Sequence, residues 1–268
     1  MNFIDTHCHL DAEEFGDAQA DVVQAAQAAG VNRIVVPSVA RANFGIVREL
    51  CERYPGCAPA YGIHPMYTDG SHPDDLAVLR EYLERPDAVA VGEIGLDFFI
   101  DHYDRARQEY FFVEQLKLAQ EFDLPVLLHI RRAQDIVLKH LRKFYGRGGP
   151  STKLRTGIAH AFNGSRQQAD EFIRLCFKLG FGGAMTYSRA TRLRELAATL
   201  PLESIVLETD APDIPPDFLE RGQPNEPQYV PLIAQTLAEL RGMTIEEIAQ
   251  ATTQNALDVL PKLANRAR

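Results

Sequence analysis

Short apolar segments alternate with amphipathic segments along almost the whole chain, and this alternation constrains the fold more than any other feature of the sequence. The segments Val89–Val91 and Val126–Leu128 contain no polar residue, which is typical of parallel strands buried on both faces. Between them, Asp104–Phe122 places apolar residues such as Phe112 and Leu116 at helical spacing. Strands that alternate with helices in this way predict a parallel sheet, and eight such strands predict a (β/α)8 barrel. A doubly wound open sheet is the alternative.

The expected elements run through the chain without a change of composition that would mark a linker. The strands are expected at Phe3–Asp5, Arg33–Pro37, Cys57–Ile63, Ala88–Glu93, Leu124–His129, Leu154–His160, Phe181–Met185 and Ser204–Glu208. The helices are expected at Ala18–Ala29, Ala42–Tyr54, Asp74–Glu84, Asp104–Phe122, Asp135–Phe144, Ser165–Lys178, Ala190–Leu200, Gln228–Leu240 and Thr244–Leu260. Because barrels of this kind run to about 250 residues as one unit, we expect a single domain over residues 1–268.

Side chains that can bind a metal follow most of the expected strands. His7 and His9 follow the first strand, and residues two apart on an extended strand point the same way, so both imidazoles can face one point. Later strands end at His64, Glu93, His129, His160 and Asp210. The carboxyl ends of barrel strands meet at one face, where active sites lie. Since buried charges are costly unless they are paired or bound to metal, we expect a divalent metal site at that face.

The ligand set divides into two groups that share one carboxylate. One ion can be held by His7, His9, Glu93 and Asp210, and a second by Glu93, His129 and His160, with Glu93 bridging. Two ions about 3.5–4 Å apart can activate water and stabilise both oxygens of an in-line displacement. We therefore predict two divalent ions as cofactors, with Zn, Mn or Mg as candidates, although mixed imidazole and carboxylate ligation suits Mg least. Glu93 and Asp210 are the predicted catalytic residues, with Asp210 as the base.

Several motifs resemble those of the TatD family of metal-dependent deoxyribonucleases, and they cover essentially the whole chain in order. They are Phe3–Leu10, Gly62–Pro65, Gly92–Asp97, Leu128–His129 followed by Arg132, His160–Gly164, Glu208–Pro212, Arg221–Gly222 and Asn225–Pro227. The resemblance implies a TIM barrel of the amidohydrolase superfamily and hydrolysis of phosphodiester bonds, typically 3′ to 5′ on single-stranded DNA. By matching position it makes His7, His9, Glu93, His129, His160 and Asp210 the metal ligands. The chain departs from the family at Phe98–Ile100, where members often carry Tyr and Arg.

Other polar residues at the strand ends are candidates for substrate contacts. His64, which precedes a proline, can touch a substrate phosphate or close a turn, and Asp97 can orient a ligand or cap a turn. Four arginines on loops of the same face can clamp phosphate bidentately, or they can be solvated surface residues. They are Arg131, Arg132, Arg166 and Arg189.

Composition limits the classes of partner. The net charge of −9 argues against a general nucleic-acid binding surface, although a local cluster can still grip a few phosphates. No apolar run approaches 18 residues and the N-terminus lacks the basic and apolar regions of a signal peptide, so we expect a cytoplasmic protein without membrane contact. We expect a monomer that acts on single-stranded nucleic-acid ends or a small phosphodiester. The alternatives are a barrel hydrolase of a lactone, amide, ester or acyl-tRNA bond, and a metal-binding protein without enzymatic activity.

Overall fold

Parallel strands that pair in chain order form the centre of the fold. The computed structural model describes residues 1–145 and 156–265, and within them the sheet has eight strands in the order β1 to β8. Their bounds are β1 Phe3–Asp5, β2 Val31–Pro37, β3 Cys57–Tyr61, β4 Ala90–Asp97, β5 Val126–Arg131, β6 Gly157–Ala159, β7 Lys178–Phe181 and β8 Ile205–Leu207. Strand β1 lies beside β8, because the Thr6 N–H donates to the Leu207 carbonyl at 3.1 Å and the Asp210 N–H to the His7 carbonyl at 2.8 Å. The predicted (β/α)8 barrel is confirmed.

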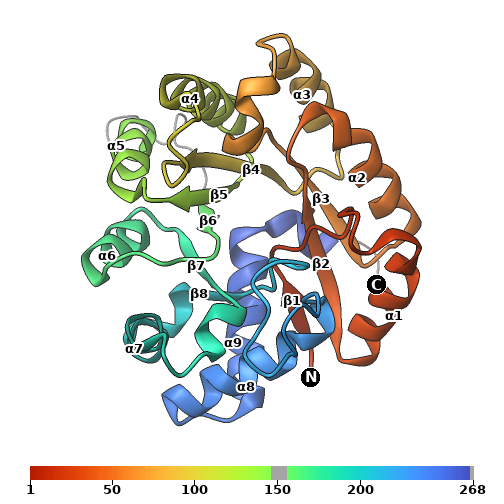
Figure 1. Ribbon diagram of the computed structural model, residues 1–268, viewed down its shortest axis with the longest axis vertical. Helices are drawn as coiled ribbons and strands as arrows, with labels where there is room; N and C mark the ends of the chain where they lie inside the picture. Colours follow the sequence, from red (N-terminus) through yellow and green to blue (C-terminus); the bar gives the residue numbers. More distant parts are fainter. Residues whose placement is uncertain (146–155, 266–268) are drawn as a thin grey trace.

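Helices surround the strands in a ring (Figure 1). Their bounds are α1 Gln19–Ala28, α2 Arg41–Arg53, α3 Asp75–Leu83, α4 Arg105–Glu121, α5 Gln134–Tyr145, α6 Arg166–Arg174, α7 Thr191–Thr199, α8 Val230–Arg241 and α9 Ile245–Val259. The side chains of Ser165 and Thr244 cap α6 and α9. Helix α9 lies within the ring in Figure 1 instead of on it, so it covers one end of the barrel.

Two apolar layers hold the barrel together. The inner layer consists of small and β-branched side chains from the strands, such as Val35, Ala58 and Ile158, and it continues into Val259 and Leu260 from the end of α9. The outer layer joins the strands to the ring of helices and is much larger. Parallel strands with an apolar layer on each side are buried on both faces, which accounts for the absence of polar alternation in their sequence.

The segment around the seventh strand differs from the prediction. The predicted helix to Lys178 ends at Arg174, and the predicted strand Phe181–Met185 lies earlier, at Lys178–Phe181. Cys176 has a left-handed backbone with φ of 64° and turns the chain out of the helix. Gly183 then starts a short 3-10 helix, Gly183–Thr186, against the 214–216 segment. The first residues of the predicted strand Leu154–His160 lie outside the described residues.

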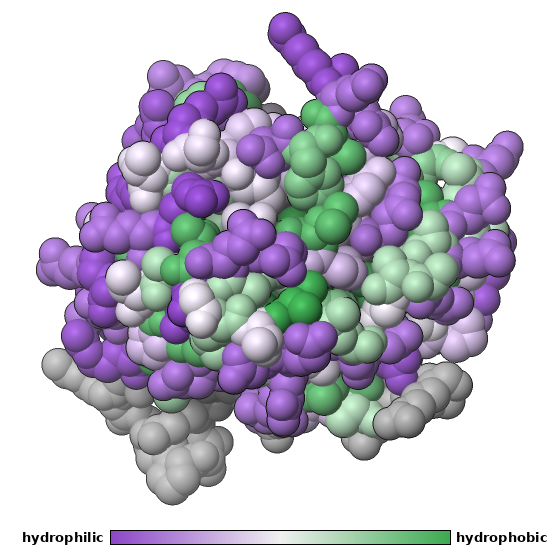
Figure 2. Space-filling view, turned by 90° about the horizontal axis from the view of Figure 1, so that it is seen from below, coloured by the Kyte–Doolittle hydropathy of each residue, from purple (hydrophilic) through white to green (hydrophobic). Residues whose placement is uncertain are grey.

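The outer surface mixes polar and apolar side chains. Figure 2 shows one face of the molecule on which hydrophilic side chains cover most of the periphery and apolar side chains lie between them. Three exposed aromatic residues, Tyr67, Phe99 and Phe218, belong to the loops that follow β3, β4 and β8. Among the described residues, no helix has both the length and the apolar composition that a membrane crossing needs.

Candidate metal centre

Glu93 reaches the centre of the barrel mouth because β4 contains an irregularity at this point. Strand β4 does not end at Glu93, as the sequence suggested, but continues to Asp97. Val91 pairs with Val126 and Ile94 with Leu128, so β4 has one more residue than β5 between these pairs. Bulges of this kind re-aim a side chain and are common beside active sites. The extra residue leaves the Glu93 N–H free of β5, and it donates instead to the Ser38 carbonyl at 3.0 Å.

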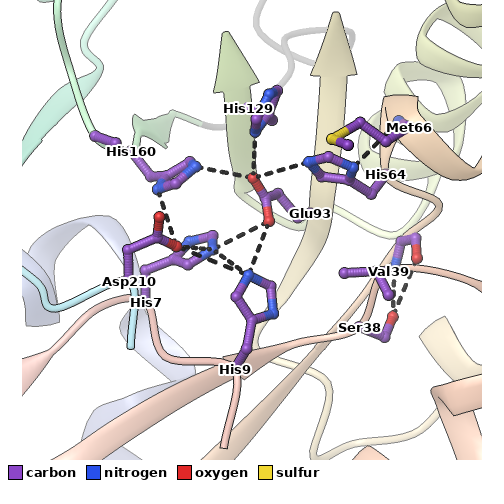
Figure 3. A network of polar contacts seen from close by, with 12 residues as sticks. His7, His9, Ser38, Val39, His64, Met66, Glu93, His129, His160 and Asp210 are labelled. Atoms are coloured by element: carbon purple, nitrogen blue, oxygen red, sulfur yellow. Dashed lines mark hydrogen bonds and ion pairs between the residues drawn. The ribbon is translucent and has the colours of Figure 1, made fainter. Parts of the chain in front are cut away.

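The two carboxylate oxygens of Glu93 face two different sets of imidazoles (Figure 3). Oε2 lies 3.1 Å from His7 Nε2 and 3.4 Å from His9 Nε2. Oε1 lies 3.0 Å from His129 Nδ1 and 2.8 Å from His160 Nε2. The structure therefore brings together residues of β4 and β5 and of the segments that follow β1 and β6, which the sequence identified as one cluster. It also places Glu93 between the two sets, as a bridging ligand requires.

Asp210 completes the cluster from the end of β8. Its Oδ1 lies 3.6 Å from His7 Nε2, 3.8 Å from His9 Nε2 and 3.9 Å from His160 Nδ1. Its backbone is left-handed, with φ of 59°. This conformation is uncommon for a residue other than glycine and is concentrated at functional sites. The Asp210 side chain is 14 % exposed and that of Glu93 only 2 %, so Asp210 is the carboxylate that meets solvent.

Asp97 contacts both His129 and the turn after β4, so its position is compatible with both roles that the sequence left open. Its Oδ2 accepts a hydrogen bond from His129 Nε2 at 3.0 Å, and its Oδ1 accepts one from the Phe99 N–H at 2.9 Å. In the neutral ring this bond holds the proton on Nε2 and leaves the lone pair of Nδ1, 3.0 Å from Glu93 Oε1, for a metal ion. Carboxylates that orient histidines in this way are usual around metal sites.

His64 lies beside the cluster as a hydrogen-bond donor. The Met66 N–H donates to His64 Nδ1 at 3.2 Å, so the neutral imidazole carries its proton on Nε2, which lies 3.6 Å from Glu93 Oε1. The ring contacts that of His129 edge to face, with centroids 4.3 Å apart. This geometry suits the predicted substrate contact better than metal ligation, since a protonated nitrogen has no lone pair to offer.

Three buried polar residues that the sequence analysis did not single out support the ligands. Asp5 accepts hydrogen bonds from the N–H groups of His7 at 3.2 Å and Thr209 at 3.0 Å, and burial raises its pKa to about 7. Asn225 donates to the Thr209 carbonyl at 2.8 Å and ties the last loop to β8. Glu208 accepts from the Ala161 N–H, next to His160. An acid inside an apolar strand, as in Asp5, is the signal that could have identified the first of them.

Glu208 depends on the lack of a side chain at Gly180. A Cβ added at Gly180 would lie 2.1 Å from Glu208 Oε2, so Gly180→Ala must displace the carboxylate and with it the support of His160. We expect a loss of about 1–3 kcal/mol of unfolding free energy, as is usual for overpacking, and weaker metal retention. Thermal unfolding with and without metal measures both effects. Gly70→Ala, with nothing within 4 Å of the added Cβ, is the matched control, and equal melting temperatures for the two variants would contradict the prediction.

The cluster holds strongly perturbed charges. Burial opposes ionisation of Glu93, but the imidazoles of His160 and His7 outweigh it and hold the pKa of Glu93 well below its usual range. Burial likewise opposes the charge of His9, but Glu93 and Asp210 raise its pKa to about 9. In His64, burial and the neighbouring His129 lower the pKa well below the usual value. The ionised carboxylates thus attract cations to a site that also contains several imidazole nitrogens.

The residues present fit divalent metal ions. Nitrogen and carboxylate oxygen atoms lie within 4.8 Å of one another in three groups. His7–His160–Asp210 and His7–His9–Glu93 contain only predicted ligands, whereas His64–Glu93–His129 includes His64, whose Nε2 carries the proton in the neutral ring. His7 Nδ1 and His160 Nδ1 are buried without a hydrogen-bond partner. Imidazole nitrogens and carboxylate oxygens are the donors that first-row divalent metals prefer.

The four candidate arginines do not all approach this centre. Arg131 and Arg132 stack on the Phe99 ring, with the guanidinium carbons 3.7 and 4.5 Å from its centroid. Arg189 lies 4.9 Å from the ring centroid of Tyr187. Arg166 is engaged on the surface of α6, where it donates to Asp170 at 2.9 Å and Thr199 at 3.3 Å, and it has no contact with the cluster among the described residues.

A (β/α)8 barrel with an imidazole and carboxylate cluster at its strand ends is the arrangement of a metal-dependent hydrolase. The family model for TatD related DNase matches residues 4–261, and the chain belongs to the TatD family of metal-dependent hydrolases.

Individual relatives match over nearly their whole length. The chain is 45 % identical over 256 residues to the uncharacterized metal-dependent hydrolase YjjV of Escherichia coli K12, covering 94 % of this chain and 95 % of YjjV. It is 31 % identical over 280 residues to the deoxyribonuclease TATDN3 of Homo sapiens, covering 98 % and 96 %. The crystal structure of the Escherichia coli YjjV, a TatD homologue, superposes with a TM-score of 0.90 at 42 % identity, covering 97 % and 98 %.

Proposed function

We propose that this chain is a phosphodiesterase that uses two divalent ions to remove nucleotides from the 3′ end of single-stranded nucleic acid. The observation that carries the proposal is the position of Glu93, whose two oxygens face separate sets of imidazoles at 2.8–3.4 Å. One set with Asp210 suits a first ion, and the other suits a second. Two ions joined by one carboxylate are a common device for in-line displacement at phosphorus.

The chain's own residues supply the remaining chemistry. Ions held by the cluster would lower the pKa of a water molecule to about 7 and polarise a phosphoryl oxygen. Asp210, the more exposed carboxylate, lies where it can accept a proton from that water. His64, with its proton on Nε2, can donate a hydrogen bond to the substrate. Arg131 and Arg132 add positive charge beside β5 in a protein whose net charge is −9.

The second candidate is hydrolysis of a carbonyl substrate such as a lactone, ester, amide or acyl-tRNA bond. The same cluster suits it, because a metal-activated water can attack carbon as well as phosphorus. The paired arginines favour the phosphodiester, since a neutral carbonyl substrate has no charge for them to bind. A metal-binding protein without turnover is the third candidate.

Metal removal tests the proposal directly. We expect chelation to abolish hydrolysis of a single-stranded oligonucleotide and Zn, Mn or Mg to restore it, because without an ion nothing lowers the pKa of the water enough for Asp210 to take its proton. The measurement compares single-stranded DNA, RNA, a lactone and an ester as substrates after reconstitution with each metal. Turnover of only the lactone or ester would favour hydrolysis of a carbonyl substrate. No turnover of any substrate would favour a metal-binding protein without enzymatic activity. Full activity without metal would contradict all three.

A further inference from the structure

An exposed aromatic ring with two arginines stacked on it lies on the loop after β4. Phe99 is 42 % exposed, although a phenylalanine side chain is normally buried. The guanidinium carbon of Arg131 is 3.7 Å from the ring centroid and that of Arg132 is 4.5 Å from it. A guanidinium this close to an aromatic face is held by a cation–π interaction. The ring therefore fixes the positions of two positive charges at the end of β5.

The backbone of Arg132 allows both arginines to reach one ring. Strand β5 ends at Arg131 and pairs with β4 up to Asp97, two residues before Phe99. Consecutive residues of a strand point to opposite faces, so Arg131 and Arg132 would diverge if the strand continued. Arg132 instead has a left-handed backbone with φ of 54°, which breaks the alternation. Left-handed backbone in a residue other than glycine is concentrated at functional sites.

The stack is connected to the metal centre through backbone and side chain. The Phe99 N–H donates to Asp97 Oδ1 at 2.9 Å, and Asp97 Oδ2 accepts from His129 at 3.0 Å. Arg131 follows His129 by two residues on β5, so both leave the strand on the same face about 6.6 Å apart. Strands β4 and β5 lie side by side in Figure 1. The stack thus lies one step outward from the cluster, on the rim of the barrel mouth.

The hydrogen-bond donors of the two guanidiniums remain available. A cation–π contact occupies the face of the guanidinium, whereas its five N–H donors lie in its plane. Within residues 1–145 and 156–265, neither side chain has a hydrogen bond or an ion pair, while Arg80, Arg85, Arg105 and Arg166 each pair with an acid. Two adjacent guanidiniums with free N–H donors are suited to bind the oxygens of a phosphate group.

We infer that Phe99, Arg131 and Arg132 form a clamp for a second phosphate, that of the nucleotide next to the scissile bond. The inference rests on the proposed function and narrows its substrate class. The scissile phosphate must lie at Glu93, whereas the two arginines stack on a ring beyond Asp97, so we assign the clamp to a different phosphate. The enzyme should therefore favour substrates with at least two phosphates over diesters with one. Phe99 acts through the arginines and is a positioning residue.

The test compares an oligothymidylate with bis(4-nitrophenyl) phosphate, a diester with one phosphate. For Phe99→Ala we expect the ratio of the two kcat/KM values, oligonucleotide over small diester, to fall about tenfold, through KM of the oligonucleotide. Phe99→Tyr keeps the aromatic face and should restore the ratio. Arg131→Ala and Arg132→Ala should each lower the ratio too. The matched control is Arg80→Ala, because Arg80 stacks on Phe122 at 5.1 Å and pairs with Glu121 on the outer helices.

A binding measurement separates this inference from the proposed function. We expect the dissociation constant of a fluorescent oligothymidylate, measured by anisotropy, to rise about tenfold in Phe99→Ala. The slope of log K against the logarithm of the salt concentration is negative, and it should become shallower by about 0.7 in each arginine variant. This is the value for one phosphate contact on a single strand. An unchanged slope and ratio would overturn the clamp even if the parent hydrolyses the oligonucleotide. If the variants lose binding as expected but the parent hydrolyses no diester, the proposed function is wrong and the clamp stands. Equal losses on both substrates in Phe99→Ala would overturn the clamp, because the ring would then act on the metal centre and not on a second phosphate.

Discussion

Glu93→Ala is expected to bind at least one divalent ion fewer than the parent after metal loading and to lower hydrolysis by about 10³-fold or more. Glu93 contacts imidazoles with both of its oxygens, so its removal takes a ligand from each half of the cluster at once. Asp210 is not expected to replace it, because its carboxylate lies 3.6–3.9 Å from His7, His9 and His160 and has no contact with His129 among the described residues.

The fold should survive this substitution. Residues at the carboxyl ends of barrel strands serve function more than stability, and the backbone of Glu93 keeps its hydrogen bond to Ser38 whatever the side chain. We therefore expect an unchanged circular dichroism spectrum beside an altered metal content. Elemental analysis after metal loading gives the number of ions per chain, and the rate is measured on the same sample.

A conservative variant and a control variant test whether the loss is specific to the Glu93 carboxylate. Glu93→Gln keeps one oxygen of the same geometry, so we expect it to retain more metal than Glu93→Ala. Glu84→Ala removes an exposed carboxylate on the outer side of the barrel, 3.8 Å from Arg80, and should change neither metal content nor rate. Two ions per chain with near-normal turnover in Glu93→Ala would show that Glu93 does not bridge.

The sequence predicts most of the cluster because each strand end can be recognised locally, and the barrel brings all strand ends to one face. An apolar run followed by histidine or an acid is visible without knowledge of any distant residue, and closure of the barrel brings the ends of all such runs to one face. His129 and His160 come together for this reason, although 30 residues separate them in sequence. The same argument placed His7 and His9 beside Asp210 from opposite ends of the chain.

The features that the sequence did not predict depend on contacts between distant segments. The irregularity of β4 at Glu93 appears only when its pairing with β5 is known. The room that Gly180 leaves for Glu208 depends on β7 and β8 lying side by side. Local propensity cannot report either of these, because each is decided by a neighbour far away in the chain.

The sequence also could not rank the four candidate arginines. From the sequence, Arg131, Arg132, Arg166 and Arg189 were equal candidates, because each lies on a loop after a strand. The structure separates them by their partners, since Phe99 holds Arg131 and Arg132 while Asp170 engages Arg166. Residue type and loop position therefore identify candidates, and the available donors of each side chain decide among them.

Asp210→Asn should separate metal binding from proton transfer. Asparagine keeps the size of the side chain and one oxygen that can ligate, but it cannot accept a proton at neutral pH. The Asp210 N–H bond to the His7 carbonyl and the left-handed backbone are both open to asparagine, which tolerates this conformation well. We therefore expect the variant to fold, to retain most of its metal and to bind oligonucleotide, while kcat falls by about 10²–10⁴, the usual contribution of a positioned base.

The measurement is kcat together with metal content and the oligonucleotide dissociation constant of the same preparation. Asp213→Asn is the matched control, because Asp213 belongs to the same loop but makes no ion pair with the histidines of the cluster within the described residues. If kcat falls only with metal content, Asp210 serves as a ligand and not as the base. If kcat stays near normal while the metal is retained, another group takes the proton. A large fall in kcat with metal and binding intact would leave Asp210 as the acceptor, because His64 presents a protonated nitrogen and Glu93 is enclosed by imidazoles on both oxygens.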